Sequence, residues 1–222
     1  MHLQKLGILF GILAPLLWLS MIGVAGAMRP GFSHITQYIS ELAERGSSTE
    51  FLMRYVAFEF TGLLYLFFAA TLWATFRNNR YTKIAIICIA LDGIGRIGAG
   101  IFPCVPGCNG LSLSQDLHHL FATIGFVSGT LAAITWGCAF WQMGAHKILT
   151  WYSIGMGALA LIFLLLLTWN QNPIKAPGLF EHLATGILSL WLLGFAVYLY
   201  FKNCGIRVVD WHILKHEWTQ MT

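Results

Sequence analysis

Six long apolar stretches constrain the fold more than any other feature of the sequence. A helix needs about 20 mainly apolar residues to cross the hydrocarbon core of a bilayer, and each stretch is about that long. Of the 222 residues, 57% are hydrophobic and only 10% are charged, whereas about a quarter of the residues in soluble domains are charged. The sequence therefore predicts an all-α membrane protein, a six-helix bundle formed by one domain over residues 1–222. The expected spans cover residues 6–27, 52–76, 84–102, 117–142, 148–169 and 179–201.

The first stretch has a second interpretation, as a cleaved signal peptide. Lys5 precedes its apolar run, and Ala25-Gly26-Ala27 follows the run as at a signal-peptidase site. The run is longer than the roughly 7–15 apolar residues of a signal core, so a retained first span is favoured. Cleavage would leave five spans.

The distribution of Lys and Arg predicts the orientation of the bundle. These residues accumulate in the short cytoplasmic segments of membrane proteins. One side of the expected topology carries eight of them and the other carries four, so both termini are expected in the cytoplasm. The eight are Lys5, Arg77, Arg80, Lys83, Lys147, Lys202, Arg207 and Lys215, and the four are Arg29, Arg45, Arg54 and Lys175. We therefore expect a multi-pass protein of the cell membrane, in bacteria the inner membrane.

The same charge pattern bears on partners. The net charge of +4 reflects the orientation bias, so nucleic acid is not an expected partner. Membrane lipids are the expected partners, and self-association into a homo-oligomer is left open. Residues 203–222 mix apolar side chains such as Trp211 and Trp218 with basic ones such as Lys215, which predicts a helix lying in the cytoplasmic interface.

Two of the five cysteines, Cys104 and Cys108, fall on the expected outer side. They flank Val105-Pro106-Gly107, a turn that brings their Cα atoms within reach of a disulfide in an oxidising compartment. A disulfide is the favoured interpretation. Free thiols and a metal site with two thiolates are the alternatives.

Charged side chains inside a membrane are costly and usually face a protein interior or a water-filled cavity. Asp92 and Arg96 are four residues apart in the third stretch, the spacing at which an acid and a base pair on one helix face. They form either a structural ion pair or part of a ligand site. Gly95 and Ala99 have small-xxx-small spacing, so we expect a neighbouring helix to pack closely around Arg96.

The fourth stretch begins with Ser112, which is followed three residues later by Gln115 as in a capping box. Asp116 and His119 then share a helix face. A carboxylate at this spacing can orient a histidine as a general base or a metal ligand, so His119 and Asp116 are candidate catalytic residues. Alternatively, Asp116 only caps the helix and one of the two adjacent histidines, His118 or His119, is an interfacial side chain.

Other polar residues have the same expected depth. Glu181 and His182 open the sixth stretch, while His34, Tyr38 and Glu41 have the spacing of one helix face, with Ser40 beside them. We predict that Arg96, His119 and His182 line one outward-opening cavity, with Glu41 or Asp116 hydrogen-bonded to a histidine. His34, Glu41, His182, Asp92 and Arg96 are the candidate ligand-binding residues.

Short motifs at the outer end resemble a known family. They are His34 and Ile39-Ser40-Glu41-Leu42 after the first span, Arg96 with Phe102-Pro103-Cys104 and Gly107-Cys108 closing the third, and His119 opening the fourth. In these motifs the chain resembles the family called domain of unknown function 998, six-span membrane proteins of bacteria and archaea. The resemblance implies fold and location but no established activity. The family pattern also leads us to expect an acidic residue at or near Val105, and the chain departs from it there.

A second, more distant similarity rests on the stretch Tyr38-Ile39-Ser40-Glu41. This stretch is similar to the damage-regulated autophagy modulator proteins of eukaryotes. It adds no activity to the interpretation.

Three classes of function fit these residues. The favoured one is binding of a lipid head group or small amphiphile, with Arg96 complementing an anion. The second is a hydrolase or transferase acting on lipids. It uses Ser40 as a nucleophile activated by histidine, or a zinc ion held by His34, His119 and His182 with a carboxylate. The third is redox chemistry, through a haem held by His119 and His182 or through the cysteine pair. The sequence contains neither G-x-S-x-G nor H-E-x-x-H.

Overall fold

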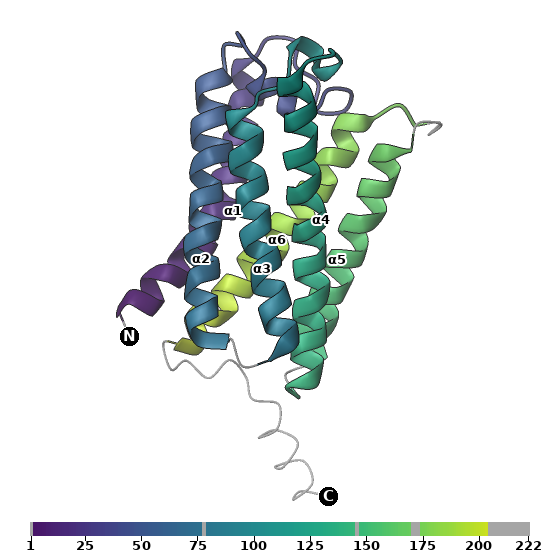
Figure 1. Ribbon diagram of the computed structural model, residues 1–222. Coiled ribbons are helices and arrows are strands. Elements are labelled where there is room, and N and C mark those ends of the chain that lie inside the picture. Colours follow the sequence, from purple (N-terminus) through teal and green to yellow (C-terminus); the bar gives the residue numbers. More distant parts are fainter. Residues whose placement is uncertain (1, 77–78, 145–146, 170–173, 204–222) are drawn as a thin grey trace, which may run out of the picture.

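The computed structural model describes residues 2–76, 79–144, 147–169 and 174–203. Within these residues all regular structure is helical, and six helices are long and apolar enough to cross a membrane. They run up and down side by side in one bundle (Figure 1). The predicted six-helix membrane bundle is confirmed. The expected interfacial helix at residues 203–222 lies almost entirely outside the described residues.

The helices follow one another with short connections. The long helices are α1 (His2–Met28), α2 (Thr61–Phe76), α3 (Arg80–Ile101), α4 (Leu113–Gln142), α5 (Lys147–Thr168) and α6 (Pro177–Asn203). The shorter helical segments are η1 (Ile39–Ala43), η2 (Leu52–Phe60) and η3 (Pro106–Cys108).

Polar caps start two of these helices four residues earlier than hydropathy predicts. The side chain of Asn79 accepts a hydrogen bond from a backbone N–H in the first turn of α3. The hydroxyl of Ser112 likewise accepts from the backbone N–H of Gln115 at the start of α4, at 3.1 Å. Only half of the predicted capping box forms, because the Gln115 side chain bonds elsewhere.

The second span is built from two segments that join without a break. The first, η2, has the wider turn of a π-helix, and α2 continues it as an ordinary α-helix. The hydroxyl of Thr61 donates to the carbonyl groups of Ala57 and Phe58 where the two meet. A wider turn changes the direction of the side chains that follow, which hydropathy does not reveal.

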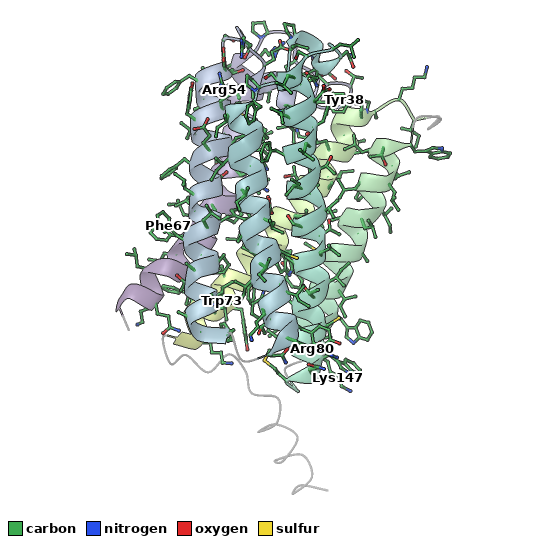
Figure 2. The ribbon with its side chains drawn as sticks, in the orientation of Figure 1. Tyr38, Arg54, Phe67, Trp73, Arg80 and Lys147 are labelled. Atoms are coloured by element: carbon green, nitrogen blue, oxygen red, sulfur yellow. A yellow bond between two sulfur atoms is a disulfide. The ribbon has the colours of Figure 1, made fainter. Side chains whose placement is uncertain are left out.

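The packing order closes the bundle into a ring. Helix α1 packs against α2 and α6, α3 packs against α2 and α4, and α5 lies between α4 and α6. Two buried apolar clusters fill the ring, a larger one around Trp136 and Phe195 and a smaller one around Trp18 and Leu42. Outward-facing apolar side chains, such as Phe67 on α2 (Figure 2), present the surface that lipid requires.

Connecting segments cover the end of the bundle opposite the start of α1. Residues 29–51 and 102–112 lie there, and we call it the capped end (Figure 1). The buried side chain of Gln115 ties residues 102–112 to α4, because its amide accepts from the Val105 N–H and donates to the Cys108 carbonyl. Arg29 also bonds the carboxylate of Glu44, which accepts from the Gly107 N–H. The cover is therefore fixed by hydrogen bonds.

Candidate functional site

A cavity lies toward the capped end, where the two apolar clusters meet. Its walls come from α1, η1, η2, α3, α4 and α6. The centre of a water molecule can occupy about 40 Å³ of this space, so the cavity is large enough to hold water or a polar group. The polar residues that line it are Ser40, Asp92, Arg96, His118, Glu181 and Thr185.

Arg96 is held in place by three neighbours and still has hydrogen-bonding capacity left. Its Nε donates to Asp92 Oδ1 at 2.9 Å, within one helix as the spacing predicts. Its guanidinium carbon lies 4.5 Å from the ring centroid of Trp18 and 4.7 Å from that of Tyr65, both cation–π distances. Among the described residues, none accepts a hydrogen bond from its terminal nitrogens. These N–H groups are free to bind an anion in the cavity.

The glycines of α3 allow this arrangement, because they bring α4 close to Arg96. A Cβ added to Gly95 would lie only 2.6 Å from the backbone nitrogen of Gly125 on α4. The two backbones therefore touch beside the arginine, and the expected close packing is confirmed.

His118 offers a second defined group to the cavity. Its Nδ1 lies 3.0 Å from the carbonyl oxygen of Ala99 and 2.9 Å from that of Phe102, so Nδ1 carries the proton and donates. The neutral ring then has an unprotonated Nε2. Within the described part of the chain Nε2 has no hydrogen-bond partner. His118 is only 2% exposed, so this acceptor is available mainly to a molecule inside the cavity.

Glu181 brings a buried carboxylate to the same cavity from α6. One oxygen, Oε2, accepts from the backbone N–H of Ile39 at 2.7 Å and so attaches η1 to α6. No described residue donates to its other oxygen. Ser40, the next residue along η1, has its hydroxyl 3.4 Å from the sulfur of Cys108.

Contacts between helices give the relative depth of these groups. Thr185, one turn below Glu181 on α6, accepts from Trp18 Nε1 at 2.9 Å, and the Trp18 ring contacts Arg96. On α3, the carbonyl group of Ala99 binds His118. Arg96 is three residues below Ala99, a separation of about 4.5 Å along the helix axis. Arg96 therefore lies about one turn deeper than Glu181 and His118.

The prediction that His119 lines the cavity is wrong. His119 is exposed, its Nε2 lies 2.7 Å from the amide nitrogen of Gln115, and it is not among the lining residues. Asp116 is also exposed, and no hydrogen bond joins it to His119 in the described chain. The adjacent His118 takes the cavity position instead. It is in register with Ala122 and Gly125, the small residues on the buried face of α4.

His34 and His182 meet each other outside the cavity lining. His34 Nδ1 lies 2.8 Å from His182 Nε2, and His182 Nδ1 lies 2.7 Å from the carbonyl oxygen of Gly178. The carboxylate of Glu41 accepts from the backbone N–H of Tyr38 and the side chain of Gln37, so it stabilises its own turn. Within the described ranges, neither Glu41 nor Asp116 bonds a histidine. Residues 34–41 do not form one helix, so the expected shared face is absent.

This arrangement does not assemble the predicted zinc ligands. Among the described residues, no three His, Cys, Asp or Glu side chains are grouped closely enough to hold a metal ion. His34 and His182 are paired with each other, whereas His119 bonds Gln115. The predicted haem ligands, His119 and His182, likewise have different partners. The structure therefore gives no support to either cofactor at these residues.

The two cysteines of the capped end are joined. Cys104 and Cys108 form a disulfide, with Cα atoms 5.1 Å apart. Both are buried, and the bridge closes the loop that contains η3.

Burial raises the pKa of the Tyr38 phenol at the capped end, and the nearby carboxylates of Glu181 and Glu41 raise it further. This phenol therefore stays protonated at neutral pH.

A family model described as a protein of unknown function, DUF998, matches residues 12–198, which is most of the chain. The chain belongs to the DUF998 family. No curated protein and no solved structure matches it. The matched region of this DUF998 protein includes every cavity residue, and the more distant similarity to the autophagy modulators stays a prediction.

Proposed function

We propose that this DUF998 protein binds an amphiphile whose head group carries a phosphate or carboxylate, in the cavity beside Arg96. The proposal rests on the contacts and the unoccupied N–H groups of Arg96. Asp92 and two aromatic rings hold the guanidinium, while its terminal N–H groups have no acceptor among the described residues. Paired donors of this kind match the two oxygens of a carboxylate or phosphate.

The rest of the lining supports an amphiphile over a simple ion. Trp18, Phe58, Phe126 and Leu188 supply apolar walls next to the polar groups. Ligand sites are typically apolar with a few placed polar groups, as here. Burial in a membrane also strengthens a charged hydrogen bond, because little water competes for it.

Retention of copurifying lipid tests this proposal. The protein is purified in mild detergent, and bound amphiphiles are counted by native mass spectrometry. We expect wild-type protein to retain about one molecule and Arg96→Lys to retain at least about tenfold less, since lysine keeps the charge but loses the paired donors. The matched control is His119→Ala, an exposed histidine beside the cavity residue, which should retain lipid normally. Equal retention by Arg96→Lys and wild type would contradict the proposal.

A second function has one observation in its favour. Ser40 and the unprotonated Nε2 of His118 line the same cavity, as a nucleophile and its base would. However, the Ser40 hydroxyl contacts Cys108 and no hydrogen bond joins it to His118 in the described chain. Binding is therefore favoured. Release of fatty acid from added phospholipid that is lost in Ser40→Ala would support the hydrolase instead.

We also infer that both termini face the cytoplasm. Figure 2 shows Arg80 and Lys147 at the end of the bundle where α1 begins, and Arg54 at the capped end. Two arginines of the capped end are neutralised by acids, Arg29 by Glu44 and Arg54 by Glu50. The excess positive charge therefore lies at the end opposite the cap, which favours a cytoplasmic position for that end.

A reporter enzyme that is active only in the periplasm tests the orientation. Fused to the carboxyl terminus, it should be inactive, because six spans return the chain to the side where it starts. Inserted after Leu111, an exposed residue of the capped end, the same reporter should be active. The reverse pattern would show that the capped end faces the cytoplasm.

A further inference from the structure

We infer that the head group bound beside Arg96 is zwitterionic, with a primary ammonium one helical turn above its phosphate, as in phosphoethanolamine. This inference rests on the proposed function and specifies its ligand class. It follows from the charges and the hydrogen-bonding groups that line the cavity.

The charge balance favours a ligand that carries a cation. Asp92 compensates Arg96 within their ion pair. Glu181, when ionised, has no cationic partner, because none of the ion pairs in the described chain includes it. With His118 neutral, the lining then carries one excess negative charge. An anion without a cation would raise that excess to two, whereas a zwitterion leaves it at one and places its ammonium beside Glu181.

The unoccupied hydrogen-bonding groups of Glu181, His118 and Arg96 differ with depth, while the second oxygen of Asp92 lies deeper still and accepts from no described residue. At the level of Glu181 and His118 they are acceptors, a carboxylate oxygen and an imidazole Nε2. One turn deeper, at Arg96, they are donors. A primary ammonium satisfies the acceptors because it has three N–H donors, and a phosphate satisfies the arginine.

This order of acceptors and donors also matches the order of the groups in a zwitterionic phospholipid. In a zwitterionic phospholipid the ammonium is the outermost group, the phosphate comes next, and the acyl chains follow. The cavity presents acceptors toward the capped end, then Arg96, then apolar residues such as Phe126 and Leu188. A trimethylated choline group lacks N–H donors and leaves the acceptors at Glu181 and His118 unpaired, so ethanolamine is favoured over choline.

Comparing lipids with identical acyl chains tests the inference. Purified protein, stripped of lipid, is titrated in detergent with phosphatidylethanolamine, phosphatidylcholine or phosphatidylglycerol, and occupancy is read by native mass spectrometry. We expect phosphatidylethanolamine to bind at least about tenfold more tightly than the other two. Soluble phosphoethanolamine is added as a competitor. If soluble phosphoethanolamine displaces the lipid at a concentration no higher than that of the lipid, the natural ligand is a soluble molecule with the same head-group chemistry.

Two variants test whether Glu181 causes the preference for phosphatidylethanolamine. Glu181→Gln keeps an oxygen for the Ile39 N–H but removes the charge, so it should bind phosphatidylethanolamine and phosphatidylglycerol equally. Glu41→Gln is the matched control, a carboxylate of the same end that does not line the cavity, and it should keep the preference.

The outcomes separate this inference from the proposed function. Equal binding of the three lipids by wild-type protein, with loss in Arg96→Lys, would overturn the zwitterion and leave the anion site standing. An unchanged preference in Glu181→Gln would also overturn the inference. Binding that does not depend on Arg96 for any lipid would remove both proposals.

Discussion

Replacing Arg96 with alanine is expected to lower the free energy of unfolding by about 3–5 kcal/mol, because the change leaves the Asp92 carboxylate buried without its cation. Asp92 is 4% exposed and lies in the middle of the α3 span, far from bulk water. The cation–π contacts to Trp18 and Tyr65 are lost as well. Unfolding in detergent, followed by circular dichroism, measures the effect.

A double variant separates the ion pair from packing. Asp92→Asn combined with Arg96→Ala removes the stranded charge, so we expect it to recover a large part of the lost stability. If the double variant is no more stable than Arg96→Ala alone, the stranded carboxylate is not the cause of the loss.

Replacing Gly95 with alanine is expected to destabilise the bundle by about 1–3 kcal/mol through overpacking. The added Cβ would lie 2.6 Å from the Gly125 nitrogen and 2.7 Å from the carbonyl oxygen of Phe121, both backbone atoms of α4. Backbone cannot move aside as a flexible side chain can, so α3 and α4 must separate. Thermal unfolding in detergent measures the loss.

Gly155 provides the matched control for this prediction. It lies in α5, it is exposed, and a Cβ added there would meet nothing within 4 Å. Gly155→Ala should therefore leave the unfolding temperature unchanged or raise it slightly, because alanine favours a helix over glycine. Equal losses from the two substitutions would show that helix contact at Gly95 is not what matters.

Features that depend on neighbouring residues in sequence could be predicted. Hydropathy located the six spans, since their lengths are set by the thickness of a bilayer. The Asp92 and Arg96 pair followed from its spacing, because residues four apart share a helix face. The turn at Pro106-Gly107 likewise indicated that Cys104 and Cys108 can meet.

The choice between His118 and His119 needed the rotation of α4 as well as its location. Neighbouring helix residues point about 100° apart, so only one of the two can face the cavity. The spacing of His118 with the small residues Ala122 and Gly125 carries that information, since small residues mark the side on which helices touch. The pairing with Asp116, which favoured His119, describes an exposed face.

Contacts between segments far apart in the sequence could not be predicted from residue spacing. His34 meets His182 across the cap, and Glu181, instead of Glu41, supplies the carboxylate of the cavity. Trp18, whose ring contacts Arg96, lies in an apolar stretch with no polar neighbour to indicate a site. These contacts depend on how α1 and α6 pack together, which the spacing of residues within each helix does not specify.

An experimental density map of the protein purified from its own membrane tests the central claim most directly, because it shows whether the cavity beside Arg96 holds a head group. The claim predicts elongated density with its polar end within hydrogen-bond distance of the terminal nitrogens of Arg96, and with an apolar tail leading away between the helices. A cavity that contains only water, or a guanidinium whose terminal nitrogens bond protein acceptors, would contradict it.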